Sequence, residues 1–411
     1  MTGASAFEQF LDPDNRADPY RLFPELRRTP VARQPDGSYV VSTYREIVAL
    51  LHDPRVSSDL RNVPEVAAIE LPPDETAPQL PPEFIRRDPP DHDRLRALAM
   101  RHFGPPHRPG RVRDMAPRMR EIIGELIDGF AGKDRIDLVD EFAYPFPLTV
   151  ICELLGVPRE DEPKFHEWSQ ILVATNDPST GTLVDRNLLR FRTMAQLGRY
   201  LNELVESRRG RPGDDLLSAL AAEPELSRPD LLTTAALLLV AGHETTVNLI
   251  GNGMLTLLRH PDVLERLRHE PDLAVSLVEE LLRYEPPVQM PGQRRSALAD
   301  IEIAGTTIPK GAVITLVLAS GNRDPERFAD PDRFDPERRD NQHLGFGGGI
   351  HYCFGAPLAR LETQLALTEL ARRLVNPRLV ADPPPYRRTA NVRGPRHLPL
   401  DLDGVHPRAA G

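Results

Sequence analysis

One segment near the middle of the chain limits the possible folds more than any other. After Ser227-Arg-Pro-Asp230, a start typical of a helix with proline in its first turn, apolar residues continue on nearly all sides to Arg259. The pattern predicts a helix over Pro229–Arg259, about 30 residues and roughly 45 Å long at ~1.5 Å per residue. Because a helix that is apolar all round must be buried, we expect it to form the central strut of a large, mainly helical protein.

A polar notch, Ala241-Gly-His-Glu-Thr-Thr246, interrupts this apolar helix. A buried carboxylate costs free energy unless it is paired or hydrated. In one interpretation, Thr245 and Thr246 donate to backbone carbonyls and Glu244 reaches the surface. In the other, Gly242 opens the helix for a ligand, and Glu244 and Thr245 deliver protons to that ligand. The notch alone leaves both interpretations open.

A second constraint comes from the glycine-rich stretch His343–Pro357, which surrounds Cys353 with two histidines and five glycines. The next residues, Ala356–Val375, have helical spacing, so the thiol should face a helix N-terminus, where the thiolate is favoured. Glycines allow the backbone to approach a large flat ligand. A thiolate in such a loop suits haem iron, for which cysteine is one of few axial ligands.

Three other interpretations of Cys353 compete with a haem ligand. An inert buried thiol is common for free cysteine. A phosphate-binding loop fails because no Gly-Lys-Ser/Thr follows the glycines. Zinc is disfavoured because the only other cysteine, Cys152, lies in an apolar segment and no Cys-x-x-Cys pair exists.

Taken together, Phe346-Gly-Gly-Gly-Ile-His-Tyr-Cys-Phe-Gly355 closely resembles the haem-ligand signature of the cytochrome P450 family. The notch likewise resembles the Ala/Gly-Gly-x-Asp/Glu-Thr motif of that family. The resemblance implies that Cys353 ligates haem iron and that Glu244 and Thr245 are catalytic. Further haem contacts implied by it are Ala241, Gly242, Phe346, Gly347 and Gly355.

The resemblance also assigns a brace for the haem loop and cations for the haem propionates. Glu280-x-x-Arg283 alone would be a common surface pair worth little, but in the family an arginine from a segment like Pro331–Phe334 joins it. The implied brace is Glu280, Arg283 and Arg333. The implied propionate partners are His92, Arg96, Arg295 and His351. For His92 and Arg96, which share one helix face, a solvated surface is the alternative.

The rest of the chain reads as helices with a small β-rich region. Pro-Asp-Gly within Val31–Thr43 predicts a hairpin, and short strands are expected over Ala299–Ile303, Thr306–Ala312, Val313–Ala319 and Val380–Leu402. Further helices are expected over Tyr44–His52, Asp91–Phe103, Asp114–Ala131, Leu148–Leu155, Leu188–Ser207, Asp262–His269 and Pro271–Tyr284. No repeat or linker divides residues 1–411, so we expect one domain, and the resemblance implies the triangular helical prism of the P450 fold.

Composition excludes several classes of protein. A formal charge of −10 argues against nucleic-acid binding. No run approaches the roughly 20 apolar residues of a membrane span, and the N-terminus carries no anchor or signal pattern. Two cysteines, one already assigned to iron, point to a reducing compartment. We therefore expect a soluble, cytoplasmic protein without a membrane anchor, and a monomer.

The function implied by the resemblance is that of a monooxygenase with haem b, which inserts one atom of O2 into a lipophilic, natural-product-like substrate. Electrons would come from NAD(P)H through a ferredoxin reductase and a ferredoxin docked over the Cys353 face, near Arg360. Expected pocket walls are the loose stretches 54–90 and 171–190 together with Val240, Val288, Met290 and Val392. Peroxide-driven oxidation, coupling or rearrangement, and a non-catalytic haem sensor or carrier are the alternatives.

Overall fold

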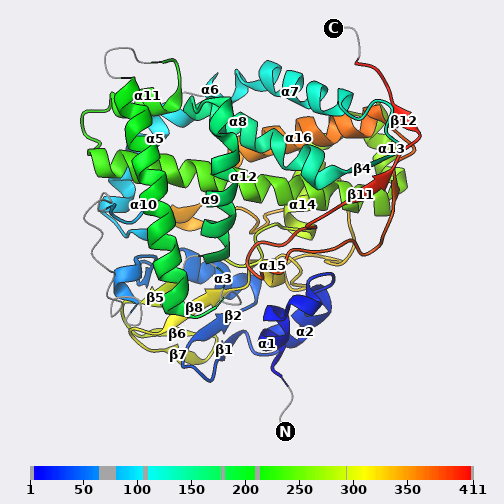
Figure 1. Cartoon of the computed structure of the whole chain (residues 1–411). Helices are drawn as coiled ribbons and strands as arrows, with labels where there is room; N and C mark the ends of the chain where they lie inside the picture. Colours follow the sequence, from blue (N-terminus) through cyan, green and yellow to red (C-terminus); the bar gives the residue numbers. More distant parts are fainter. Residues whose placement is uncertain are drawn as a thin grey trace.

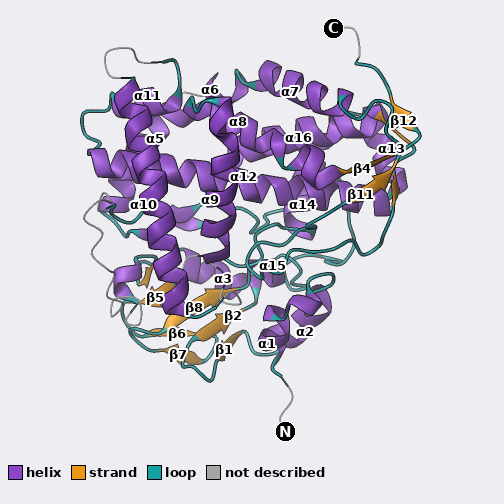
Figure 2. Ribbon diagram, viewed as in Figure 1, coloured by secondary structure: helices purple, strands orange, loops and turns teal. Residues whose placement is uncertain are grey.

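The computed structural model describes residues 4–63, 80–104, 110–175, 177, 181–208, 213–292 and 294–408. Helices form the larger part, and most strands gather at one end of the molecule, beside the N-terminal helices (Figures 1 and 2). The α-helices are α1 (Ala6–Leu11), α2 (Phe23–Arg27), α3 (Tyr44–Leu51), α5 (Asp91–Phe103), α6 (Gly110–Arg113), α7 (Ala116–Asp128), α8 (Pro145–Leu155), α9 (Glu162–Thr175), α10 (Leu183–Ser207), α11 (Leu216–Ala221), α12 (Arg228–Arg259), α13 (Pro261–His269), α14 (Leu273–Tyr284), α15 (Leu318–Gly321) and α16 (Ala356–Arg373). None of these described helices combines the length and hydrophobicity of a membrane span.

Helix α12 is the central strut that its sequence predicts. The Ser227 side chain accepts from the Asp230 backbone N–H and so caps the helix, which then runs to Arg259. It crosses the whole molecule and packs against α8, α9, α10 and α16 (Figure 1). Most of its residues are buried, because other elements cover it on several sides.

The strands form small sheets. The largest has the order β1-β2-β8-β5-β3, in which β2 runs parallel to β8 and the other pairs are antiparallel. The strands are β1 (Val31–Arg33), β2 (Tyr39–Val41), β3 (Val56–Ser57), β4 (Arg135–Asp137), β5 (Arg295–Ala297), β6 (Ile301–Ile303), β7 (Thr306–Ile308), β8 (Val313–Leu316), β9 (Leu374–Val375), β10 (Arg378–Leu379), β11 (Pro399–Asp401) and β12 (Gly404–Val405). The predicted hairpin is confirmed, with Val31 opposite Val41.

Three expectations about secondary structure are wrong or incomplete. The predicted strand Val313–Ala319 ends at Leu316, and the short helix α15 follows. Most of Val380–Leu402 is irregular, because five prolines interrupt it; only β11 and isolated bridges at Tyr386 and Val392 pair there. Helix α9, whose apolar residues are spread round the helix, was not predicted.

Candidate active site

A cavity of about 310 Å3 lies where α12, the loop before α16 and the segment 83–86 meet. Most of the residues that the sequence assigns to cofactor, catalysis or substrate line it: Arg96, Val240, Ala241, Gly242, Thr245, Val288, Met290, Arg295, Phe346, Gly347, His351, Cys353, Gly355 and Val392. His92 and Glu244 lie outside this lining. The structure thus brings together residues from distant parts of the chain.

Cys353 is half-buried at the end of the glycine loop, directly before α16. Its backbone N–H donates to the Phe346 carbonyl at 2.9 Å, and the neighbouring Phe354 packs on Phe103. Burial raises the pKa of the Cys353 thiol, although the N–H groups of Gly355 and Ala356 lower it. Burial therefore opposes the thiolate that the sequence predicted, while the helix N-terminus favours it. A coordinated metal cation deprotonates a thiol outright.

The four predicted propionate partners form one cationic cluster. The rings of His92 and His351 lie 4.4 Å apart, and burial together with Arg295, His92 and Arg96 lowers the pKa of His351 to about 3. Burial also lowers the pKa of Arg295, to about 10. Neither Arg96 nor Arg295 makes an ion pair with a carboxylate in the described part of the chain; they donate to the Tyr352 carbonyl and the Ser58 hydroxyl.

These contacts fit haem. Three buried ring or guanidinium nitrogens in the cluster, His92 Nε2, His351 Nδ1 and Arg295 Nε, have no hydrogen-bond partner among the described residues. Buried polar groups of this kind normally have a partner, so an anionic ligand is expected here. The haem propionates would pair with the cation cluster, and the Cys353 thiolate would bind the iron.

The side chains of the polar notch have different surroundings. The Thr245 side chain lines the cavity and donates to the Ala241 carbonyl at 2.9 Å, and Thr246 donates to the Gly242 carbonyl. Glu244 is buried instead of reaching the surface, and its Oε2 lies 3.6 Å from Nη1 of Arg387. The threonines therefore donate to backbone carbonyls, as the first interpretation of the notch predicts. That interpretation is wrong about Glu244, which it placed at the surface.

Gly242 lines the cavity, yet its missing side chain serves packing as well. A Cβ atom built on it would lie 3.3 Å from Cδ1 of Ile151 in α8. Glycine at this position lets α12 and α8 approach each other beside the cavity.

The brace around Glu280 has a different third member from the one expected. Arg283 donates to the buried Glu280 carboxylate through Nε and Nη2, at 2.8 and 2.7 Å. Arg338 adds a contact at 3.3 Å, while the Arg333 side chain is 70% exposed and contributes only its carbonyl, which accepts from Arg283. The assignment of Arg333 is wrong: each arginine closes its own turn, Arg333 with the Asp330 carbonyl and Arg338 with the Asp335 carbonyl, and sequence spacing does not show which side chain turns inward.

Arg360 forms a second brace with Glu279 and Phe346. Its guanidinium donates twice to the Glu279 carboxylate, at 2.7 and 2.8 Å, and stacks over the Phe346 ring. This arrangement holds the glycine loop against α14, so Arg360 is less free for a partner protein than the sequence suggested.

Two further residues near the notch were missed from the sequence. Glu362 of α16 is fully buried and lines the cavity, and burial raises its pKa well above the ordinary value. A glutamate within the predicted helix Ala356–Val375 was the available signal. Arg387 lies 143 positions after its partner Glu244, and no local pattern marks the pair.

The substrate walls combine apolar and charged groups. Leu172 and Val173 of α9 line the cavity, as expected for the stretch 171–190, and Met194 of α10, which lies beyond that stretch, lines it as well. Glu83 and Arg190, which form an ion pair, line it too. Both residues lie in the stretches 54–90 and 171–190 that were expected to line the pocket, so charged groups join the apolar walls.

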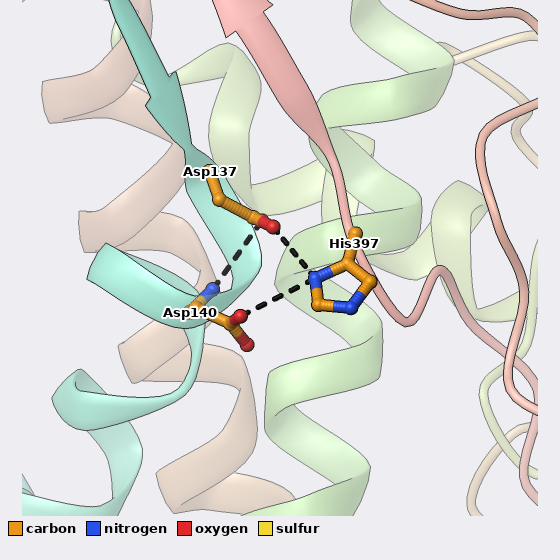
Figure 3. A group of neighbouring side chains, drawn as sticks. All are labelled: Asp137, Asp140 and His397. Carbon is orange, nitrogen blue, oxygen red and sulfur yellow. Dashed lines mark hydrogen bonds and ion pairs between the residues drawn. The ribbon is translucent and has the colours of Figure 1, made fainter.

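A separate polar cluster lies at β4 and β11, outside the cavity. Nδ1 of His397 lies 2.7 Å from Asp137 and 3.3 Å from Asp140 (Figure 3). The Asp137 carboxylate also accepts from the backbone N–H groups of Val139 and Leu398. These bonds tie the turn after β4 to the segment before β11.

Comparison with known proteins identifies the family. The family profile "Cytochrome P450" matches residues 74–389, and the chain therefore belongs to the cytochrome P450 family. It is 41% identical to cytochrome P450 monooxygenase PikC of Streptomyces venezuelae, over 95% of this chain and 92% of that protein. It is 39% identical to 6-deoxyerythronolide B hydroxylase of Saccharopolyspora erythraea, over 94% and 96%.

Solved structures agree with the fold. The cytochrome P450 enzyme CxnD, described as acting in C–S bond formation in chuangxinmycin biosynthesis, superposes with a TM-score of 0.86 at 36% identity, covering 97% of this chain and 98% of that one. The chain is thus an oxidoreductase of the P450 type with a haem-iron cofactor, and bacterial members of this family generally need O2 and a redox partner.

Proposed function

We propose that this protein is a haem b monooxygenase that inserts one oxygen atom of O2 into a lipophilic, natural-product-like substrate. One observation carries the proposal: Cys353 and Thr245 line the same cavity, beside a cationic cluster able to hold two carboxylates. When bound, haem supplies O2 activation, in which two electrons and two protons leave one oxygen atom in the product and the other in water.

The residues of the chain divide the remaining tasks. Cys353 would hold the iron through Sγ, and His92, Arg96, Arg295 and His351 would hold the propionates. Thr245 lines the cavity, and Glu244, which precedes it in the chain, would renew the proton of the Thr245 hydroxyl. Apolar walls such as Val240, Val288 and Val392 exclude water and orient the substrate.

Electron supply lies outside this cavity. We expect a ferredoxin and its NAD(P)H-dependent reductase as partners and a chain that acts as a single-domain monomer. Similarity to PikC and to 6-deoxyerythronolide B hydroxylase supports oxidation of a natural product.

A coupling reaction is the second candidate. Similarity to CxnD, which is described as acting in C–S bond formation, favours it. The acid and hydroxyl at Glu244 and Thr245 favour O2-driven chemistry over peroxide-driven oxidation, which brings its own protons.

Isotope labelling tests the proposal. A compound library is first screened for low-to-high-spin shifts, and the compound with the largest shift is incubated with NADPH, a surrogate ferredoxin system and 18O2. We expect one 18O atom in the product. A product of unchanged oxygen content would overturn monooxygenation in favour of coupling. Thr245→Ala should divert electrons to hydrogen peroxide; unchanged coupling would remove Thr245 from proton delivery.

A further inference from the structure

The surroundings of Glu244 contain a cluster of buried polar atoms that lies outside the cavity lining. Six side-chain atoms there make no hydrogen bond with any described residue: Tyr144 Oη, His166 Nδ1, His243 Nδ1, Glu244 Oε1, Asn248 Oδ1 and Arg387 Nε. We refer to these six residues as the Glu244 cluster.

The members of the Glu244 cluster are close neighbours. The Tyr144 ring lies between two histidine rings, 3.9 Å from His166 and 4.5 Å from His243 by ring centroids. Asn248 donates to the backbone carbonyl of Glu244 at 2.7 Å, and Arg387 is the ion-pair partner of that carboxylate. The Glu244–Arg387 pair also interacts electrostatically with His166, which links the two sets of contacts.

Unmatched polar atoms at this density predict bound water. An isolated buried donor or acceptor without a partner costs about 1–3 kcal/mol, and six together exceed what a stable core tolerates. Ordered waters normally satisfy such groups, each making about three hydrogen bonds. A polar site with several partners per water meets that requirement.

The Glu244 cluster and the surface cluster of Figure 3 are carried by the same two segments. The first segment begins at Asp137, continues through the π-helical turn Val139–Ala143, which contains Asp140, and ends at Tyr144. The other runs from Arg387, whose N–H donates to the Gly394 carbonyl, to His397. His397 and Asp140 are partly exposed, so this end of both segments is open to solvent.

The charges around Glu244 come from several elements. Arg387 approaches from the C-terminal segment, His166 from α9, Tyr144 from the start of α8 and His243 from α12 itself. On the α16 side, Glu362 lies near Thr246. Burial lowers the pKa of His166; Glu244 and Asp140 raise it, and Arg387 and Arg396 lower it. His166 is thus within electrostatic reach of both clusters.

We propose that waters held by Tyr144 and His166 form the route by which protons pass from the His397–Asp140 surface cluster to Glu244, with Arg387 positioning the Glu244 carboxylate. The inference rests on the proposed function, because it explains how Glu244 recovers the proton that Thr245 passes on. Arg387 and His166 are positioning residues, since neither lines the cavity.

The role of Arg387 follows from its charge. It is the one cation that forms an ion pair with Glu244 among the described residues, and its side chain is only 13% exposed. A buried carboxylate that loses its cation takes up a proton and becomes neutral. Arg387 therefore holds the Glu244 carboxylate in place at the inner end of the water route.

Infrared spectroscopy of the purified haem protein tests this role without measuring turnover. Arg387→Met should show a new carboxylic-acid band at neutral pH that disappears in Arg387→Met/Glu244→Gln, whereas Arg387→Lys should lack it. Arg388→Met is the matched control, because Arg388 follows directly in the chain and is exposed. Absence of the new band in Arg387→Met would overturn the role of Arg387.

Solvent isotope effects test the water route. NADPH oxidation is measured in H2O and D2O with a surrogate ferredoxin system and myristic acid as the probe, chosen because the cavity is mostly apolar. His166→Phe should slow oxidation about tenfold and raise the isotope effect, because its ring neither binds water nor transfers protons. His166→Gln, which still binds water, should recover much of the rate. Equal rates and isotope effects in wild type and His166→Phe would overturn the route.

The two proposals fail in different ways. If the 18O2 experiment or Thr245→Ala gives the contrary result, the proposed function itself is wrong. If those results stand but Arg387→Met and His166→Phe both behave as wild type, only the route is wrong. A crystal structure without water density between Tyr144, His166 and Glu244 would also contradict it.

Discussion

Two glutamates of this protein, Glu280 and Glu244, are both buried and both contact arginine, but their surroundings differ. The Glu280 carboxylate receives donors from Arg283, Arg338, Asn341 and the backbone N–H of Asp335. Glu244 has one arginine at 3.6 Å and one oxygen without a partner. The first is fully satisfied, and the second is not.

This difference in hydrogen bonding indicates that Glu280 has a structural role and Glu244 a role in proton transfer. A saturated ionic network fixes the backbone around it, and the Glu280 network joins α14 to the carbonyls of Asn322, Pro331 and Arg333 ahead of the haem loop. A carboxylate with free hydrogen-bonding capacity can exchange protons. We therefore expect substitutions at Glu280 to change stability and substitutions at Glu244 to change turnover.

Glu280→Gln should give the largest effect. Removing the negative charge leaves the buried Arg283 cation uncompensated, which typically costs about 3–5 kcal/mol. Urea unfolding of the haem protein, together with haem content after purification, measures this loss. A stability within about 0.5 kcal/mol of wild type would remove Glu280 from its structural role.

Glu244→Gln should affect turnover much more than stability. The amide is nearly isosteric, so we expect a change in stability below about 1 kcal/mol, while NADPH-driven turnover falls by about 100-fold because the amide does not relay protons. Both quantities are measured on the same preparation. A large loss of stability with normal turnover would place Glu244 in the same class as Glu280.

Arg338→Met and Arg333→Met sharpen the assignment of the brace. Arg338 donates to Glu280 and to the carbonyls of Ala329 and Asp330, so its loss should cost about 1–3 kcal/mol. Arg333→Met, on an exposed side chain, should change stability by less than about 0.5 kcal/mol. The reverse order of the two variants would restore the assignment made from the sequence.

Substitution of Glu279 should have a small effect on stability, and that effect depends on pH. Hydrogen bonds from Arg360 and His343 outweigh burial and lower the pKa of Glu279 from 4.5 to about 2. Because the folded pKa lies below the unfolded one, this stabilisation is present above pH 4.5 and disappears as the pH falls toward 2. With solvent screening, we expect Glu279→Gln to cost on the order of 1 kcal/mol at pH 7. The gap from wild type should narrow below pH 4.5; a constant gap would contradict the shift.

Local sequence patterns predicted the parts of the fold that depend on local physics. Helix α5 has the expected bounds, Asp91–Phe103, and α12 starts one residue before Pro229, because capping residues and apolar periodicity act over one or two turns. Helix α9 was missed because its apolar residues do not gather on one face. Prolines in Val380–Leu402 replaced expected strands with irregular backbone.

The sequence predicted those parts of the candidate site that depend on residue type and on the order of motifs along the chain. The residues around Cys353 and the cation cluster lie together as the resemblance implied. The choice between Arg333 and Arg338, and the contact of Arg387 with Glu244, depend on how loops turn in space. Interactions between residues more than a hundred positions apart leave no local signature.

The ligation of haem iron by Cys353 underlies every functional proposal made above. The most direct test is the carbon monoxide difference spectrum of the reduced protein, recorded for wild type and for Cys353→Ser. We expect wild type to show the strongly red-shifted Soret band of thiolate-bound haem and Cys353→Ser to lack it. A wild-type protein that binds haem without that red-shifted band would contradict thiolate ligation by Cys353.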